Sequence, residues 1–201
     1  MENIYDEFKN ITMTGRICYL FMCIEKYLIT LYPNNDWTPI AKRMWQWTNK
    51  FWNKSWDIYS EAVPEFILEF DTYEETNIKE YEGNLKKDDY KKIIACFKGI
   101  TNGNENDEIC QVLMFPIDFG NFCDGASFYG AEPYVLEILS DMRKILLKHS
   151  IPIPDTSKLD CFTFERGKRT RIDEPELGWG GLANTENLSS QGICGIIKEI
   201  K

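Results

Sequence analysis

The sequence lacks the residues and motifs that most often carry enzyme chemistry. It has one histidine, His149, which excludes a zinc site built from several histidines and makes any Ser–His–Asp triad depend on that residue. It has no CxxC, HExxH or Walker A sequence. Its many carboxylate pairs show no spacing or flanking sequence typical of a catalytic pair. We therefore expect a protein that is not an enzyme, with no catalytic or cofactor-binding residues and no metal site.

Long apolar runs and a secretion signal are lacking as well. The longest apolar run, residues 17–32, is interrupted by Glu25 and Lys26 and is too short and too amphipathic to span a bilayer. The N-terminal MENIYDEFKN has neither the basic region nor the cleavage site of a secretory signal. The seven cysteines are scattered and odd in number, which favours reduced, buried thiols over a disulfide framework. We expect a cytoplasmic protein with no membrane partner.

Two stretches resemble ligand-binding motifs but lack the required context. GWGGLA, residues 178–183, fits the loose dinucleotide pattern GxGxxA, yet no strand precedes it and no apolar helix follows it. NGNENDE, residues 102–108, resembles a calcium loop but has Asp107 where the loop needs glycine and Leu113 where it needs glutamate. We expect a turn at the first stretch, with Trp179 fixed into the fold, and no ion at the second.

The residues that are present can form a sizeable helical core. Of the 201 residues, 43% are hydrophobic and 14% aromatic, which suits one domain over residues 1–201. Apolar residues recur at spacings of three and four in the N-terminal three quarters of the chain. The fold class expected is mainly α, a multi-helix domain with a small C-terminal element in which a β-strand is one alternative. The helical part is expected at residues 11–150 and a mixed tail of loop and short strand at 151–201.

Start signals place the individual helices. Thr14 is a plausible N-cap for the first helix, and Asp88 or Asp89 for the fourth. Pro39 suits the first turn of a second helix, because proline has a preset φ and no N–H to leave unbonded. Pro64 is expected to start or to kink the helix at residues 57–70. The expected helices cover residues 14–32, 38–56, 57–70, 90–100 and 131–150.

Three further apolar stretches lie outside these helices. Residues 111–119, QVLMFPIDF, suit either a strand or a short buried helix that ends before Pro116. Residues 161–166, CFTFER, alternate like a short strand, whereas residues 192–200 suit either a strand or a helix.

Five of the six tryptophans lie within residues 37–56. On a helical wheel they share two adjacent apolar stripes, while the basic residues Lys42, Arg43, Lys50 and Lys54 lie on the polar arc. A groove that stacks sugars or nucleic-acid bases would intermix the two kinds of residue, so we interpret the stripes as core. Trp37 and Trp56, near the ends, are predicted to be partly open. The residues predicted to be mainly buried are Met44, Trp45, Trp47, Phe51 and Trp52.

Charge is distributed unevenly along the chain, whose net charge is −9. Residues 61–82 hold eight acids against one base, and residues 101–141 hold eight acids and no base. Residues 143–171 reverse the balance, with eight bases against three acids. Such a field repels nucleic acid and favours a cationic partner. The alternative is an acidic surface that serves only solubility.

The Trp-rich AKRMWQW, residues 41–47, and the tail IPIPDTSKLDCFTFERGKRTRIDEPELGWGG, residues 151–181, resemble the immunity proteins of bacterial polymorphic-toxin and contact-dependent growth-inhibition systems. The resemblance implies a 1:1 complex with a cognate toxin domain, in which the immunity protein blocks the toxin's active site or its substrate path. It implies no particular site residues. It leaves the activity of the toxin and the oligomeric state open.

The acidic segments are the predicted contact with such a partner, because an acidic surface speeds association with a cationic domain. Two other functions are alternatives: a small cytosolic enzyme with a carboxylate-lined cleft, and a helical adaptor or regulatory module. The residues predicted to bind the partner are Glu74, Glu75, Asp107, Glu108, Asp118 and Asp124.

Overall fold

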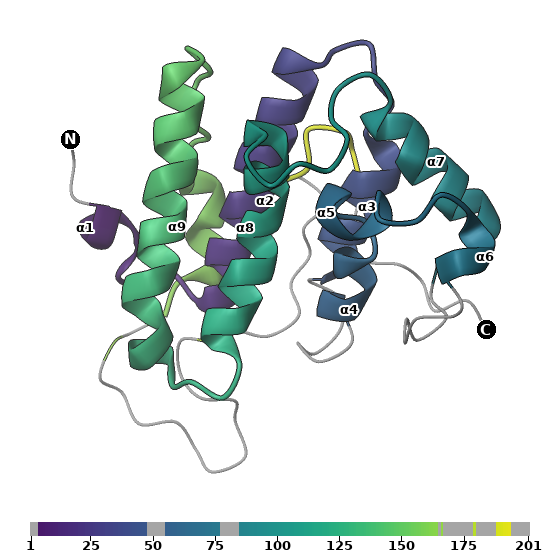
Figure 1. The fold of residues 1–201 in the computed structure, drawn as a ribbon. Coiled ribbons are helices and arrows are strands. Elements are labelled where there is room, and N and C mark those ends of the chain that lie inside the picture. The colour runs from purple at the N-terminus through teal and green to yellow at the C-terminus, as the bar shows by residue number, and fades with distance from the viewer. Residues whose placement is uncertain are drawn as a thin grey trace.

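The computed structural model describes residues 4–47, 55–76, 85–164, 166, 179 and 188–193, without the side chains of 55–57. The fold is mainly α, a multi-helix domain as predicted, and these residues contain no β-strand (Figure 1). Its elements are α1 (Ile4–Phe8), α2 (Met13–Leu31), α3 (Thr38–Gln46), α4 (Ser55–Ser60), α5 (Pro64–Ile67), α6 (Tyr73–Thr76), α7 (Lys87–Phe97), α8 (Glu108–Cys123), α9 (Phe128–Lys148) and the 3₁₀ helix η2 (Thr156–Phe162).

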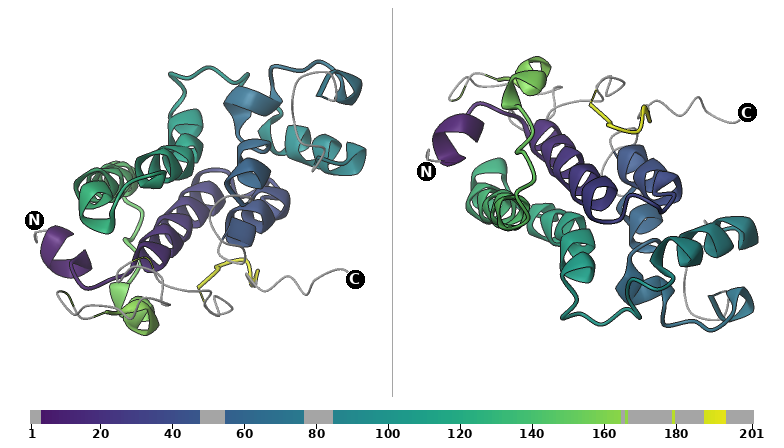
Figure 2. Two further views of the ribbon diagram at one scale, coloured as in Figure 1. Left: turned by 90° about the horizontal axis from the view of Figure 1, so that it is seen from below. Right: turned by 90° about the horizontal axis from the view of Figure 1, so that it is seen from above.

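Helix α2 lies at the centre of the molecule. The antiparallel pair α8 and α9 packs against one side of it, and α3 packs against another (Figures 1 and 2). Helices α4 to α7 gather around α3 and reach α8 through α4 and α5. Because α2 has neighbours on several sides, most of its residues are buried, including Arg16 and Glu25.

The start of α2 differs from the prediction. Thr12, not Thr14, is the N-cap, and its hydroxyl accepts a hydrogen bond from the Gly15 amide at 3.2 Å. Thr14 lies in the first turn, where both its amide and its hydroxyl donate to the Trp179 carbonyl oxygen. Trp179 is thereby fixed to the helical body, as predicted for that residue.

Residues 111–119 form the middle of α8, which continues through Pro116 to Cys123. Of the two alternatives left open for this stretch, the helix is formed and the strand is not, but the helix does not end before Pro116. An internal proline costs about 3 kcal/mol because it removes one helical hydrogen bond. Burial of the apolar side of α8 outweighs that cost, and the Tyr59 hydroxyl donates to the Leu113 carbonyl oxygen, 2.7 Å away, in the same turn. The buried apolar residues of α8 are Ile109, Cys110, Val112, Leu113, Pro116, Ile117, Phe119 and Cys123.

The strand predicted at residues 161–166 is not formed. Residues up to Phe162 belong to η2, and only an isolated antiparallel bridge joins Thr163 to Ile11. The partner segment is the short link between α1 and α2, so no strand is there to extend the pairing. Of residues 192–200, those from 194 onward lie outside the described residues.

The tryptophan stretch is core wherever it is described. Met44, Trp45 and Trp47 are buried, as predicted. Trp37 was predicted to be partly open but is only 2% exposed, because its indole donates to the Tyr32 carbonyl oxygen and its ring packs against Phe97. The Phe51 and Trp52 predictions, and that for the Trp56 side chain, lie outside the described residues.

Arg43 was also misplaced by the helical wheel. It is buried rather than on the polar arc, and its guanidinium donates to the Glu61 carboxylate at 2.8 Å and to the Ile58 carbonyl oxygen at 2.6 Å. A partner distant in sequence therefore decides its position.

The remaining helix predictions hold with shifted boundaries. The helix predicted at 57–70 is two short helices, α4 and α5, and Pro64 begins the second. Lys86, rather than Asp88 or Asp89, is the N-cap of α7, and both acids lie in its first turn, where they favour the helix dipole. Helix α9 begins earlier than predicted, after Ser127, whose hydroxyl accepts from the Gly130 amide.

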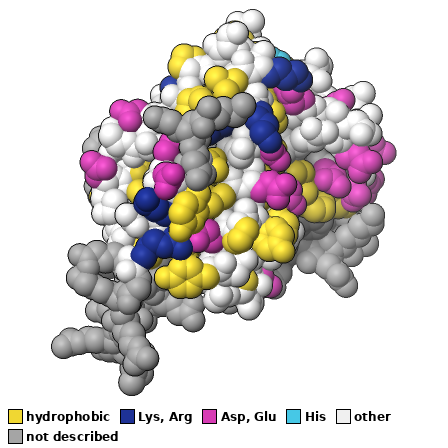
Figure 3. Space-filling model, turned by 90° about the vertical axis from the view of Figure 1, so that its left-hand side faces the viewer, with side chains coloured by type: hydrophobic (Ala, Val, Ile, Leu, Met, Phe, Trp, Pro, Cys, Tyr) yellow, Lys and Arg dark blue, Asp and Glu magenta, His cyan; other side chains and the backbone are white. Residues whose placement is uncertain are grey.

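Cysteines are mostly buried where they are described. Cys18, Cys23, Cys96, Cys110 and Cys123 are buried free thiols, whereas Cys161 is exposed. On the side of the molecule formed by α1 and α9, hydrophobic side chains reach the surface with acidic and basic side chains around them (Figure 3). Among the described residues, the exposed large hydrophobic side chains are those of Tyr5, Ile29, Phe122, Tyr129, Tyr134, Leu147 and Ile153.

Candidate functional site

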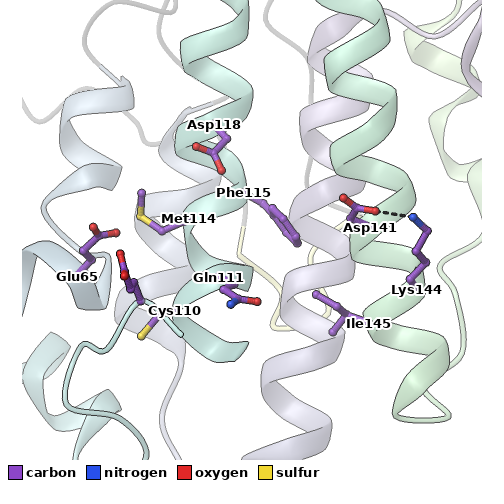
Figure 4. A pocket seen from close by; sticks show the side chains of 10 residues that line it. Glu65, Cys110, Gln111, Met114, Phe115, Asp118, Asp141, Lys144 and Ile145 are labelled. Carbon is purple, nitrogen blue, oxygen red and sulfur yellow. Dashed lines mark hydrogen bonds and ion pairs between the residues drawn. The ribbon is translucent and has the colours of Figure 1, made fainter. Parts of the chain in front are cut away.

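An open groove of about 510 Å³ runs over α8, between α5 on one side and α9 on the other (Figure 4). Its floor is apolar and its rim is mostly acidic. The lining residues are Glu65, Glu105, Cys110, Gln111, Met114, Phe115, Asp118, Asp141, Lys144 and Ile145.

The helical period of α8 explains why these side chains meet. Gln111, Phe115 and Asp118 are spaced by four and three residues, so they share one side of the helix. The opposite side faces the core. On α9, Asp141, Lys144 and Ile145 share a side in the same way, and the Phe115 ring lies between the two helices (Figure 4).

The electrostatics of the groove are strongly negative. Of its four carboxylates, Asp141 has a cation partner, Lys144, at 2.7 Å. Among the described residues no ion pair joins Glu65, Glu105 or Asp118 to a base. Burial raises the pKa of Asp118 above its ordinary value, and the nearby charge of Glu65 raises it further. A cation in the groove would stabilise the ionised form of Asp118 and so lower its pKa again.

The one thiol in the groove is not a nucleophile at neutral pH. Burial raises the pKa of the Cys110 thiol, so the reactive thiolate is scarce. Its sulfur lies 3.3 Å from the Thr101 hydroxyl, which also donates to the Asp107 carboxylate at 2.6 Å. These contacts fix the loop before α8.

One of the predicted partner-binding residues, Asp118, lines the groove. Asp107 and Glu108 lie at the start of α8 and Asp124 directly after its end, so they are spread over about 25 Å at 1.5 Å per residue. Asp107 is the N-cap and is held by Thr101, whereas Asp124 is exposed at the turn into α9. The structure therefore does not gather these acids into one patch.

Glu74 and Glu75 lie on α6, away from the groove residues in sequence and in the fold. The Glu74 carboxylate pairs with Lys87 at 2.5 Å, and the Glu75 carboxylate accepts a hydrogen bond from the Asp71 amide at 3.0 Å. Both side chains are exposed. Their contacts join α6 at the surface to Lys87 on α7 and to Asp71 just before α6.

The groove also contains three acids that sequence reasoning missed: Glu65, Glu105 and Asp141. All three fall within the acid-rich segments 61–82 and 101–141, which was the available signal. Nothing in the sequence distinguishes them from the other acids there, because the fold alone brings α5 beside α8.

Glu108 and the lone histidine, His149, form a separate cluster where the start of α8 lies beside the end of α9. The Glu108 carboxylate contacts His149 Nε2, pairs with Lys148 Nζ at 2.5 Å and accepts from the Tyr27 hydroxyl at 3.2 Å. Burial raises the pKa of Glu108, but hydrogen bonds from Lys148 and His149 outweigh burial and leave the pKa below its ordinary value. An acid at the start of α8 and bases at the end of α9 suit both helix dipoles, so this cluster joins the two helices.

Two further observations concern the described residues alone. No helix in them is both long enough and apolar enough to cross a membrane. No three of their His, Cys, Asp or Glu side chains come together as a metal site would require. In comparisons with family models, curated proteins and solved structures the chain matches none of them, so the chemistry of the groove is inferred from its own residues.

Proposed function

We propose that this chain is an immunity protein that binds a cationic toxin domain and neutralises it by covering its active site or substrate path, and that it does so in the cytoplasm. The groove over α8 is the proposed contact. The observation that carries the proposal is an open groove with an apolar floor in which three carboxylates have no cation partner among the described residues.

The floor and the rim contribute differently to binding. Phe115, Met114 and Ile145 are only partly buried, so a partner that covers them gains roughly 25 cal/mol for each Å² of apolar surface removed from water. Asp118 and Glu65 repel each other and are partly desolvated before any partner arrives. A lysine or arginine of the partner would neutralise that repulsion in a site that is already partly dry, where charge pairs contribute most.

The uneven charge of the chain supports the same partner. Residues 101–141, which include all of α8 and most of the groove, contain no base. The resulting negative field would steer a cationic domain toward the groove and raise the association rate, with a strong dependence on salt. The same field disfavours nucleic acid as the ligand.

A carboxylate-lined catalytic cleft is the second candidate function. The observation that favours it is the raised pKa of Asp118 beside Glu65, caused first by burial, because burial raises the pKa of many carboxyl groups that act in general acid–base chemistry. A catalyst would protect cells in amounts far below that of the toxin, whereas a binding protein must match it one to one.

Growth of a bacterium tests the proposal. The chain is co-expressed with a candidate toxin domain encoded by a neighbouring gene, and rescue of growth is measured. We expect the wild-type chain to rescue growth only when its amount reaches that of the toxin. The double variant Glu65→Lys/Asp118→Lys should fail to rescue, whereas Asp160→Lys, an exposed acid on η2, should rescue fully. Full rescue by the double variant at equal expression would contradict the proposed contact.

A further inference from the structure

A stacked pair of exposed aromatic side chains lies near the turn that joins α8 to α9. The rings of Phe122 on α8 and Tyr134 on α9 are 4.6 Å apart between centroids and only 8° from parallel. Phe122 is 41% exposed and Tyr134 is 50% exposed. Two large rings that stack on each other and still keep this much surface in water form a patch of the kind that marks interaction sites.

The stack and the groove share one side of the hairpin. Asp118 and Phe122 are four residues apart on α8, so they are surface neighbours on the same side of that helix. Tyr134 and Asp141 are seven residues apart on α9, which is two turns. The groove is therefore continuous with the stack along the seam between the two helices.

Two more exposed carboxylates lie close to the stack along the chain. Asp124 follows Phe122 by two residues, and Glu137 follows Tyr134 by about one turn; both are exposed. The hairpin supplies no lysine or arginine before Arg143 to neutralise them. A cation placed over an aromatic ring with a carboxylate beside it is attracted by both groups, by the quadrupole of the ring and by the charge of the carboxylate.

The fold already places arginine side chains between an aromatic ring and a carboxylate, and Arg166 is one of them. The guanidinium of Arg166 lies 5.1 Å from the centroid of the Tyr129 ring and pairs with the Glu132 carboxylate at 2.8 Å. A planar guanidinium can stack on a ring and donate to a carboxylate at the same time, which an ammonium cannot do equally well. At the stack of Phe122 and Tyr134 the ring and the carboxylates are present, and the described residues place no guanidinium over them.

We infer that Phe122, Tyr134 and Asp118 together form an arginine-binding site for the partner. The inference rests on the proposed function, in that the partner is a cationic protein domain. It adds that the cationic side chain of the partner is an arginine. This arginine lies against the stacked rings and beside the groove carboxylates.

Two peptides of equal charge test it: octa-arginine and octa-lysine, each acetylated and amidated. Their dissociation constants with the full chain are measured by NMR titration at low salt. We expect octa-arginine to bind about two- to fivefold tighter, the size of one exposed cation–π contact. The double variant Phe122→Leu/Tyr134→Leu should bind both peptides equally, with octa-lysine unchanged. Tyr129→Leu is the matched control, because that ring is 55% exposed on the same helix but is already occupied by Arg166, and it should keep the preference.

The outcomes separate this inference from the proposed function. Asp118→Asn should weaken both peptides, because both need the groove carboxylate. If the wild-type chain binds the two peptides equally, or if the double leucine variant keeps the preference, the arginine site is refuted while a cationic partner still stands. If the wild-type chain binds neither peptide, both the arginine site and the cationic contact are refuted.

Discussion

Replacing Glu132 with glutamine is expected to destabilise the fold more than any other single loss of charge on α9. The Glu132 carboxylate is buried and pairs with Arg16 at 2.7 Å and with Arg166 at 2.8 Å. Arg16 has no exposed side-chain surface, so the variant leaves a guanidinium in the core with its countercharge removed. Breaking a buried pair in this way costs about 3–5 kcal/mol. Arg166 is 23% exposed, so solvent screens its share of the loss.

The pH dependence of this contribution has a definite sign. Burial raises the pKa of Glu132, but hydrogen bonds from Arg166 and Arg16 outweigh it and hold the pKa below its ordinary value. A carboxyl group whose pKa is lowered by folding contributes its full stabilisation above the unfolded-state pKa, and the contribution is lost as the pH falls through the folded-state pKa. The difference between the wild type and Glu132→Gln is therefore expected to be largest near pH 7 and to vanish in acid.

Urea denaturation followed by far-UV circular dichroism measures this difference. Glu137→Gln is the matched control, because it makes the same change at an exposed position on the same helix and should alter the unfolding free energy by less than about 0.5 kcal/mol. If Glu132→Gln costs no more than Glu137→Gln at pH 7, or if its cost persists unchanged at low pH, the reasoning about the buried pair is wrong.

Three other changes test separate parts of the structure. Glu25→Gln should lower the unfolding free energy by about 1–3 kcal/mol, because Trp45 and Ser189 donate to one oxygen of the buried carboxyl group and the Ser190 amide donates to the other. Glutamine keeps only one of these oxygens, so its NH₂ would face a donor at the other. Urea denaturation measures the change, and an unchanged midpoint would contradict it. Gly15→Ala should lower the melting temperature, since a Cβ there would lie 2.6 Å from the Phe162 side chain and overpacking of this kind costs about 1–3 kcal/mol. Asp118→Asn should raise the unfolding free energy at neutral pH, because burial and the charge of Glu65 raise the pKa of Asp118 and so penalise its ionised form. The gain should disappear as the pH falls through that pKa. A lower unfolding free energy at pH 7 would contradict this prediction.

The sequence predicts best those helices whose apolar periodicity is long. The helix at 131–150 was predicted from apolar residues that recur at spacings of three and four, and α9 buries Val135, Leu136, Leu139 and Met142. Burial of Met44 and Trp45 in α3 followed from the same kind of pattern.

Predictions failed where a partner distant in sequence decides the outcome. Pro116 signals a helix end locally, but the core that α8 covers keeps the helix continuous. Trp37 looks open at a helix start, but the Tyr32 carbonyl oxygen and the Phe97 ring close over it. Arg43 looks solvent-facing on the wheel, but Glu61 lies opposite.

The candidate site shows the same division. Asp118 was proposed because residues 101–141 contain no base, and charge along the sequence is a local property. That Glu65 would lie near it, with Phe115 and Ile145 as an apolar floor, depends on how α5 and α9 pack around α8. The aromatic stack depends on the antiparallel pairing of α8 and α9, which joins residues twelve apart across a turn.

Binding of the purified chain to the toxin domain that it is proposed to neutralise decides whether the groove over α8 is the contact. Isothermal titration calorimetry should give a 1:1 complex, and the double variant Glu65→Lys/Asp118→Lys should weaken it by at least about a hundredfold, since close charge pairs across an interface are worth about 1.5–7 kcal/mol. The control Asp160→Lys should leave the dissociation constant unchanged. An unaltered dissociation constant for the double variant would contradict the claim that the groove over α8 is the contact.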